Sequence, residues 1–111
     1  MNDQKKIFLQ VSLPDYVVDW IDLNAEKKVL KRGPTCRLVL IEVLSNIDEN
    51  ELPKFQFVFC HKVNLSTTIV AFEITKQMNE KLLNLCKYIP VSKKKLAEIL
   101  ICQKFESSRE V

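Results

Sequence analysis

Cysteine and histidine most often carry metal or nucleophile chemistry, and this 111-residue chain has four cysteines and one histidine. Cys36, Cys60, Cys86 and Cys102 are spaced by 24, 26 and 16 residues, which matches neither a zinc finger nor a zinc ribbon. Cys60 and His61 together cannot complete a tetrahedral site. No motif supplies the orienting group and oxyanion site that a Cys-His nucleophile requires. We therefore expect buried thiols, no metal ion and no cofactor.

Other catalytic signatures are missing from the sequence as well. There is no Gly-rich phosphate loop, no G-x-S-x-G motif and no paired-carboxylate signature. The sequence therefore predicts that the protein is not an enzyme.

Basic side chains form three clusters whose charge suits an anionic partner. They are Lys5 and Lys6, then Lys27, Lys28, Lys31, Arg32 and Arg37, and last Lys93, Lys94 and Lys95. Acidic residues concentrate in DENE, residues 48–51. A net charge of +3 permits a polyanionic partner without requiring one. Charge runs are usually solvated faces.

Length and composition predict one globular domain, because 111 residues with 47% hydrophobic content can build one core. No apolar run approaches the roughly 20 residues that span a bilayer. MNDQKK leads into a strand and not into a signal sequence. We expect a cytoplasmic protein without membrane contact.

Residues 7–47 read as one strand and two helices. IFLQVSL, residues 7–13, alternates as a strand does, and Pro14 suits the first turn of the helix that follows. KRGP at 31–34 is interpreted as its end, and Thr35 as the N-cap of a second helix, Cys36 to Ile47. That helix is apolar nearly all round, which indicates burial on several sides and leaves a strand as the alternative.

The second half repeats this order. Residues 68–74 alternate as a strand, and Thr75 is the expected N-cap of an amphipathic helix with Met78, Leu82, Leu85, Cys86 and Ile89 on one face. Pro90 breaks it, and Ser92 caps a last helix that runs through Phe105. In our alignment Ile74 matches Leu13, Val91 matches Pro34 and Ser92 matches Thr35, so the first helix is four residues longer. The connector, 48–65, includes a Phe-rich segment, 55–62, that suits either an added strand or an apolar cover for the core.

The doubled order of strand, helix, breaker and capped apolar helix resembles the ribbon-helix-helix family of DNA-binding regulators. The resemblance covers residues 6–47 and 66–106. The doubled unit is similar to single-chain regulators of some archaeal viruses and to the TraY type, and a viral protein of this kind would act in the host cytoplasm. It implies an α+β, mostly α fold in which two units form an intramolecular pseudo-dimer, with a two-stranded antiparallel ribbon over four helices. Residues 7–13 would then pair with residues 68–74, which answers the need of a lone strand for a partner.

The resemblance also implies two sets of DNA contacts. The outer face of the ribbon would enter the major groove, which admits a two-stranded ribbon. The expected base-contacting residues are Lys6, Phe8, Gln10, Ser12, Thr67, Ile69, Ala71 and Glu73. The N-termini of the second helices would hold phosphates, as free N–H groups there favour anions. The expected phosphate-contacting residues are Thr35, Cys36, Arg37, Ser92, Lys93 and Lys94.

The function expected from the resemblance is a sequence-specific regulator, most simply a repressor, that binds double-stranded DNA at a pseudo-palindromic operator. It would fold as a monomer with an internal pseudo-two-fold axis, and further self-association on DNA stays open. Two alternatives remain. One is a protein-interaction module such as an antitoxin-like partner, and the other is an accessory protein for plasmid DNA processing.

Overall fold

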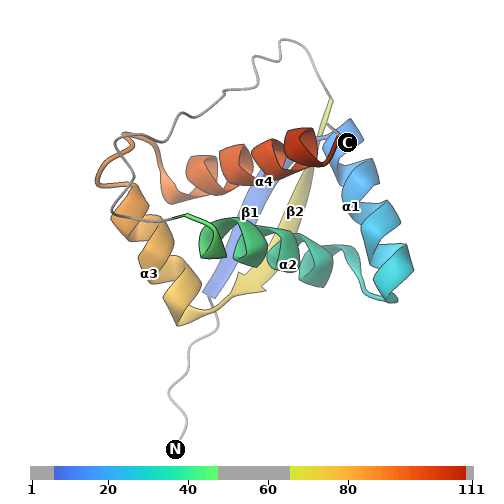
Figure 1. Cartoon of the computed structure of the whole chain (residues 1–111), viewed down its shortest axis with the longest axis horizontal. Helices are drawn as coiled ribbons and strands as arrows, with labels where there is room; N and C mark the ends of the chain where they lie inside the picture. Colours follow the sequence, from blue (N-terminus) through green and yellow to red (C-terminus); the bar gives the residue numbers. More distant parts are fainter. Residues whose placement is uncertain (1–6, 48–65, 110–111) are drawn as a thin grey trace, which may run out of the picture.

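The computed structural model describes residues 7–47 and 66–109, in which the order strand, helix, helix occurs twice (Figure 1). The elements are β1 (Ile7–Pro14), α1 (Asp15–Lys28), α2 (Arg32–Ser45), β2 (Thr67–Ile74), α3 (Lys76–Leu85) and α4 (Lys93–Arg109). The expected α+β class, mostly helical with a two-stranded sheet, is confirmed for these residues. Lys6 and the connector, with its Phe-rich segment 55–62, lie outside them.

The two strands form one antiparallel ribbon, as predicted. The register runs from Ile7 opposite Ile74 to Pro14 opposite Thr67. One face is buried, as the alternation of apolar residues requires. The buried side chains of this face are Leu9, Val11, Leu13, Val70, Phe72 and Ile74.

Hydrogen bonds fasten the start of β2 to the start of α1. The Asp15 backbone N–H donates to the Ser66 carbonyl at 3.1 Å. The Thr68 hydroxyl donates to Asp15 Oδ1 at 2.8 Å. Asp15 therefore joins both strands at the end of the ribbon where β1 leads into its helix.

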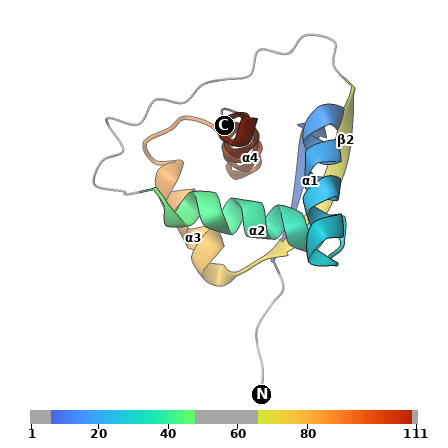
Figure 2. The same cartoon turned by 45° about the vertical axis from the view of Figure 1, so that its right-hand side comes forward.

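The helices α2 and α4 lie across the same face of the ribbon and run in opposite directions (Figure 1). Both views place α1 and α3 at opposite ends of this pair (Figures 1 and 2). Packing is exchanged between the halves, because α2 packs against β2 while α4 packs against β1. Each strand is therefore covered by the second helix of the other half.

The second helices also approach the two free edges of the ribbon. On one edge, the Ser12 backbone N–H donates to Glu98 Oε2 of α4 at 2.7 Å. On the other edge, Gly33 in the first turn of α2 comes so close that an added Cβ would lie 3.0 Å from the Ala71 carbonyl oxygen. Each edge of a two-stranded sheet has unpaired backbone groups, so these contacts cover the ribbon from both sides.

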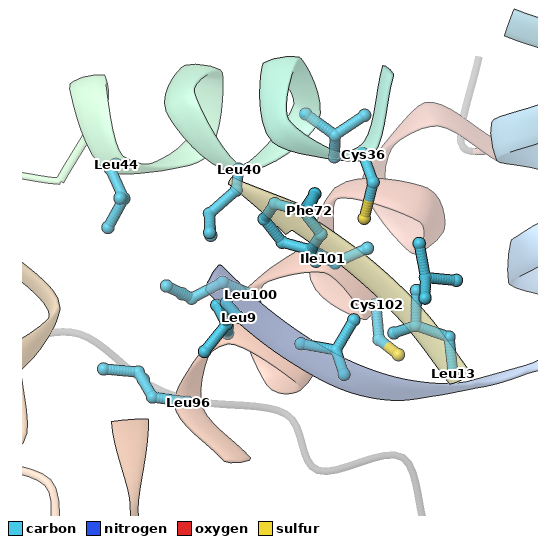
Figure 3. Packing of buried hydrophobic residues seen from close by; sticks show 14 of the residues in the cluster. Leu9, Leu13, Cys36, Leu40, Leu44, Phe72, Leu96, Leu100, Ile101 and Cys102 are labelled. Atoms are coloured by element: carbon cyan, nitrogen blue, oxygen red, sulfur yellow. The ribbon is translucent and has the colours of Figure 1, made fainter. Parts of the chain in front are cut away.

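The core lies between the ribbon and the helices (Figure 3). Leucine and isoleucine fill its centre, with the Phe105 ring of α4 set against two aromatic rings of α1. The ring centroids of Tyr16 and Trp20 are 5.3 and 5.5 Å from that of Phe105. Edge-on and tilted rings at this separation attract one another beyond the gain from burial. The end of α4 is therefore anchored on α1.

The predicted start of α2 is wrong. The helix begins at Arg32 with Lys31 as its N-cap, and Gly33 and Pro34 lie in its first turn. Thr35 is not the cap, since its hydroxyl donates to the Lys31 carbonyl at 2.9 Å. Proline is tolerated in a first turn because its missing N–H would have no intrahelical acceptor there. The close approach to β2 favours glycine here, because a Cβ would lie 3.0 Å from the Ala71 carbonyl oxygen.

The predicted alignment of the halves is corrected with it. A single shift of 61 positions carries Leu13 to Ile74 and the N-cap Lys31 to Ser92. The same shift relates residues 7–13 to residues 68–74, whose patterns of exposed and buried positions are identical. The helix α1 is four residues longer than α3, as expected, with 14 residues against 10. The spacing from Leu13 to the N-cap Lys31 nevertheless equals the spacing from Ile74 to the N-cap Ser92.

The remaining caps agree with the sequence. The Thr75 hydroxyl accepts from the Met78 N–H at 3.1 Å, and the Ser92 hydroxyl accepts from the Lys95 N–H at 3.1 Å. Each satisfies a first-turn donor that has no intrahelical acceptor.

The end of α1 is strained at Val29, the residue that follows the last helical position. Its side chain is 90% exposed, and its φ of 55° and ψ of 47° are left-handed. The N–H groups of Val29 and Leu30 donate to the carbonyls of Glu26 and Ala25. Such a helix end usually carries glycine, because a Cβ is unfavourable in this conformation.

We expect Val29→Gly to raise the free energy of unfolding by about 1 kcal/mol, because glycine adopts this conformation without the Cβ clash. Urea denaturation followed by circular dichroism measures the change. The matched control is Val29→Ile, which keeps the branched Cβ and should leave the midpoint unchanged. A Val29→Gly protein no more stable than the parent would contradict strain at this position.

Candidate nucleic-acid interface

The outer face of the ribbon carries the predicted base-contacting residues that lie in the described part of the chain. Strand alternation exposes Phe8, Gln10, Thr67, Ile69 and Ala71, and leaves the side chains of Ser12 and Glu73 half-buried. All seven come from two adjacent strands, so the structure brings them onto one surface. The eighth, Lys6, lies outside the described residues.

These side chains are arranged in rows across the ribbon. Phe8 lies opposite Glu73, Gln10 opposite Ala71, and Ser12 opposite Ile69. The central row is Gln10 with Ala71. A shift of 61 positions carries one member of this row to the other.

Charge is nearly absent from this face. Of the residues in β1 and β2, only Glu73 is ionisable, and neither strand holds a lysine or arginine. Within residues 7–47 and 66–109, any attraction for an anionic partner must therefore come from the helices.

The N-terminus of α4 carries three consecutive lysines, of which two are engaged. Lys93 Nζ donates to Asn79 Oδ1 at 2.6 Å. Lys95 Nζ lies 3.8 Å from Glu98 Oε1. Lys94 is exposed, and the described residues offer its ammonium group no hydrogen bond or ion pair. The backbone N–H groups of a first helical turn have no intrahelical acceptor, so Lys94 stands beside donors suited to an anion.

The predicted phosphate contacts at α2 are displaced by the earlier start of the helix. Thr35 and Cys36 are fully buried, so their side chains face the core and not solvent. Arg37 is half-buried, and no described group accepts a hydrogen bond from its buried Nε. The exposed basic residues at this helix end are Lys31 and Arg32.

Arg32 is held by an acidic neighbour. Its Nε and Nη2 donate to Asp22 Oδ1 and Oδ2, each at 2.8 Å, in a two-pronged ion pair between α1 and α2. This hydrogen-bonded pairing lowers the pKa of the Asp22 carboxyl and raises the pKa of the Arg32 guanidinium. Both groups are largely exposed, so the pair adds little to stability.

The sequence analysis did not name Lys31 and Arg32 as candidate phosphate contacts. They match Ser92 and Lys93 once the 61-residue shift is applied, and equal spacing from each strand to its second helix would have pointed to them.

The cysteines of the described residues, Cys36, Cys86 and Cys102, are in the reduced form. Cys36 and Cys102 are buried and Cys86 is half-buried, which confirms the expected burial for two of them, whereas Cys60 lies outside the described residues. Burial raises the pKa of the Cys36 thiol from 9.0 to about 12. This group therefore stays neutral at physiological pH, unlike a thiolate nucleophile.

Comparisons with protein-family profiles, curated proteins and solved structures gave no match. Among the helices of residues 7–47 and 66–109, none is both long and apolar enough to cross a bilayer.

The raised pKa of Cys36 predicts a loss of stability in alkali. The folded state favours the neutral thiol. The contribution of Cys36 to the free energy of unfolding is therefore fully present below the unfolded pKa of 9.0, and it declines as the pH rises toward the folded pKa of about 12. We expect roughly 1 kcal/mol less unfolding free energy per pH unit in this window from this group. Urea midpoints from pH 8 to 11 measure it.

The control is Cys36→Ala, because alanine occupies the matching position, Ala97, in α4 and is also fully buried there. This variant should show a shallower alkaline decline than the parent. Parallel declines would assign the effect to other groups.

Proposed function

We propose that this chain is a sequence-specific regulator of transcription, a repressor, that reads the major groove of double-stranded DNA with its ribbon and needs no cofactor. The proposal includes a tandem ribbon-helix-helix architecture in which the halves form a pseudo-dimer inside one cytoplasmic polypeptide. It rests chiefly on one observation. Gln10 and Ala71 lie opposite each other in the strand register and are also equivalent positions under the 61-residue shift.

That coincidence supports an internal pseudo-two-fold axis. In a two-fold arrangement of antiparallel strands, the residues at the axis must be both paired and equivalent. Gln10 and Ala71 meet both conditions. The exchanged packing of α2 on β2 and α4 on β1 is the arrangement that an axis through this pair would generate.

Readout is assigned to residues of the outer face of the ribbon by their chemistry. A glutamine can donate to and accept from adenine in the major groove, so Gln10 is the adenine reader. Ser12 is permissive, and Glu73 accepts from cytosine. Ile69 and Ala71 suit the thymine methyl group.

Phosphate contacts are assigned to the two second helices, which would flank the ribbon on DNA. At α4 they are Ser92, Lys93 and Lys94, as in our initial prediction. At α2 we move them to Lys31 and Arg32, since Thr35 and Cys36 are buried. Arg32 would then have to exchange its Asp22 partner for phosphate.

A protein-interaction module is the second candidate. It is favoured by the exposure of Phe8 and Ile69, at 64% and 67%, on strands without a basic residue. Large exposed apolar side chains are typical of protein contacts. An accessory role in plasmid DNA processing would use the same DNA contacts.

The salt dependence of binding to duplex DNA separates a DNA-binding protein from a protein-interaction module. Each neutralised phosphate releases counterions and makes the logarithm of affinity fall with the logarithm of salt concentration by about 0.9. A DNA-binding protein gives a steep slope, and failure to bind any duplex at low salt would overturn the proposal.

Gln10→Ala and Lys94→Ala should impair DNA binding in different ways. Loss of the base reader should cost ~1 to 3 kcal/mol and relax preference at one base pair, whereas loss of a phosphate contact should weaken all sequences alike and lower the salt slope by about 1. Binding of both variants to a panel of single-base operator changes measures this. The matched control is Lys87→Ala on the turn after α3, and uniform weakening by Gln10→Ala would remove Gln10 from the reading face.

The preferred site should be a pseudo-palindrome. In a homodimer the two strands are identical, and the operator mirrors the symmetry of the protein. Here equivalent positions hold Gln10 and Ala71, or Ser12 and Glu73, so the half-sites meet different chemistry at equal spacing. Selection from random duplexes measures the consensus, and perfect inverted symmetry would indicate two copies of one strand in the groove.

A further inference from the structure

Contacts that join the first half of the chain (β1, α1, α2) to the second half (β2, α3, α4) are not repeated under the shift of 61 positions. At the free edge of β1, Glu98 Oε2 accepts a hydrogen bond from the Ser12 backbone N–H at 2.7 Å. The Glu98 side chain is 12% exposed, so water competes little for this bond. The shift relates Glu98 to Arg37 and Ser12 to Glu73. A guanidinium group has donors only, so Arg37 cannot accept the equivalent bond on the edge of β2.

The hydrogen bond at the start of α1 has no equivalent either. The Thr68 hydroxyl of β2 donates to Asp15 Oδ1 in the first turn of α1 at 2.8 Å. The equivalent positions hold Ile7 and Lys76. An isoleucine side chain has no donor and a lysine side chain has no acceptor. This bond therefore requires a strand from the second half and a helix from the first.

The aromatic contact is also specific to one combination of halves. The Phe105 ring at the end of α4 lies against the rings of Tyr16 and Trp20 on α1. The residues at the three equivalent positions are not aromatic: Leu44, Gln77 and Lys81. The attraction between rings is therefore available only when the end of α4 meets α1.

We propose that the two halves are selective partners, each of which fits the unlike half better than a like half from a second copy of this chain. The inference rests on the pseudo-two-fold arrangement that is part of the proposed function, and it uses none of the DNA contacts. In that arrangement every contact between halves joins one residue of the first half to one of the second. Pairing of like halves replaces one of these residues with its equivalent under the shift.

Pairing of like halves loses contacts and adds repulsion. In a complex of two first halves, the Ser12 N–H would face Arg37 of the other copy, and both groups are donors. In a complex of two second halves, Glu98 would lie at the strand edge beside Glu73, which has a charge of the same sign. Juxtaposed like charges disfavour a wrong partner, and a specific interface combines such penalties with good contacts to the right one.

The experiment starts from the full chain, with a protease recognition sequence inserted in the connector, 48–65. The folded protein is cut, unfolded in urea and returned to buffer by dilution. Native mass spectrometry then measures which halves are combined, because the two halves differ in mass. We expect complexes of a first half with a second half to form well above the proportion that random pairing gives.

Variants of the same cut protein assign the selectivity to the contacts. Glu98→Arg gives the second half the residue of the first and leaves the Ser12 N–H facing a donor. It should lower the preference for unlike halves by about fivefold, the net worth of one ordinary hydrogen bond. Glu98→Gln keeps an acceptor oxygen and should keep the preference. Phe105→Leu makes the same exchange at the aromatic contact and should lower the preference as well.

The matched control is Ser107→Asn. It also gives the second half the residue of the first, since Asn46 is equivalent to Ser107, but this position of α4 is exposed. The control should leave the preference unchanged. Circular dichroism of each uncut variant shows whether the full chain still folds.

The outcomes separate this inference from the proposed function. Random pairing of the halves would overturn selective pairing and leave DNA binding untouched. Halves that stay apart would overturn it too, because the contacts would then be too weak to select a partner. An uncut protein that binds no duplex, but whose halves reassemble only in unlike pairs, would keep selective pairing and lose the proposed function.

Discussion

The pairing of β1 with β2 is the interaction on which the rest of this structure depends. Each strand has an apolar face that needs a cover and backbone groups that need partners, and neither is available from its own half alone. Antiparallel pairing satisfies one edge of each strand. The second helix of the opposite half covers the other edge, through Glu98 at Ser12 and through Gly33 at Ala71. Helix placement, core and outer surface all follow from that pairing.

Much of the fold could be predicted because its main signals are local. Alternation over residues 7–13 and 68–74 defines both strands, and Thr75 and Ser92 cap helices as their types suggest. The start of α2 could not be found in this way. Gly33 and Pro34 have the composition of a helix end, and only the approach of Gly33 to Ala71 explains a glycine inside the first turn. That contact joins residues far apart in the chain.

The candidate site was predictable to the same extent. Strand periodicity identifies which side chains lie on the outer face, and the structure places them there. Strand periodicity cannot show which charged side chains pair with neighbouring groups. Arg32 is bound by Asp22 and Lys93 by Asn79, while Lys94 remains available among the described side chains. These pairings depend on how the ends of neighbouring helices meet.

The distance along the chain between the two strands has a consequence for synthesis. Pro14 and Thr67 are paired, so β1 is synthesised more than 50 residues before the start of its partner. At 5–20 residues per second this interval lasts roughly 3 to 10 s. During that time the apolar face of β1 has neither β2 nor α4 to cover it. The two strands that form the ribbon are therefore separated in time during synthesis, and the apolar face of β1 is buried only after the second half of the chain has been made.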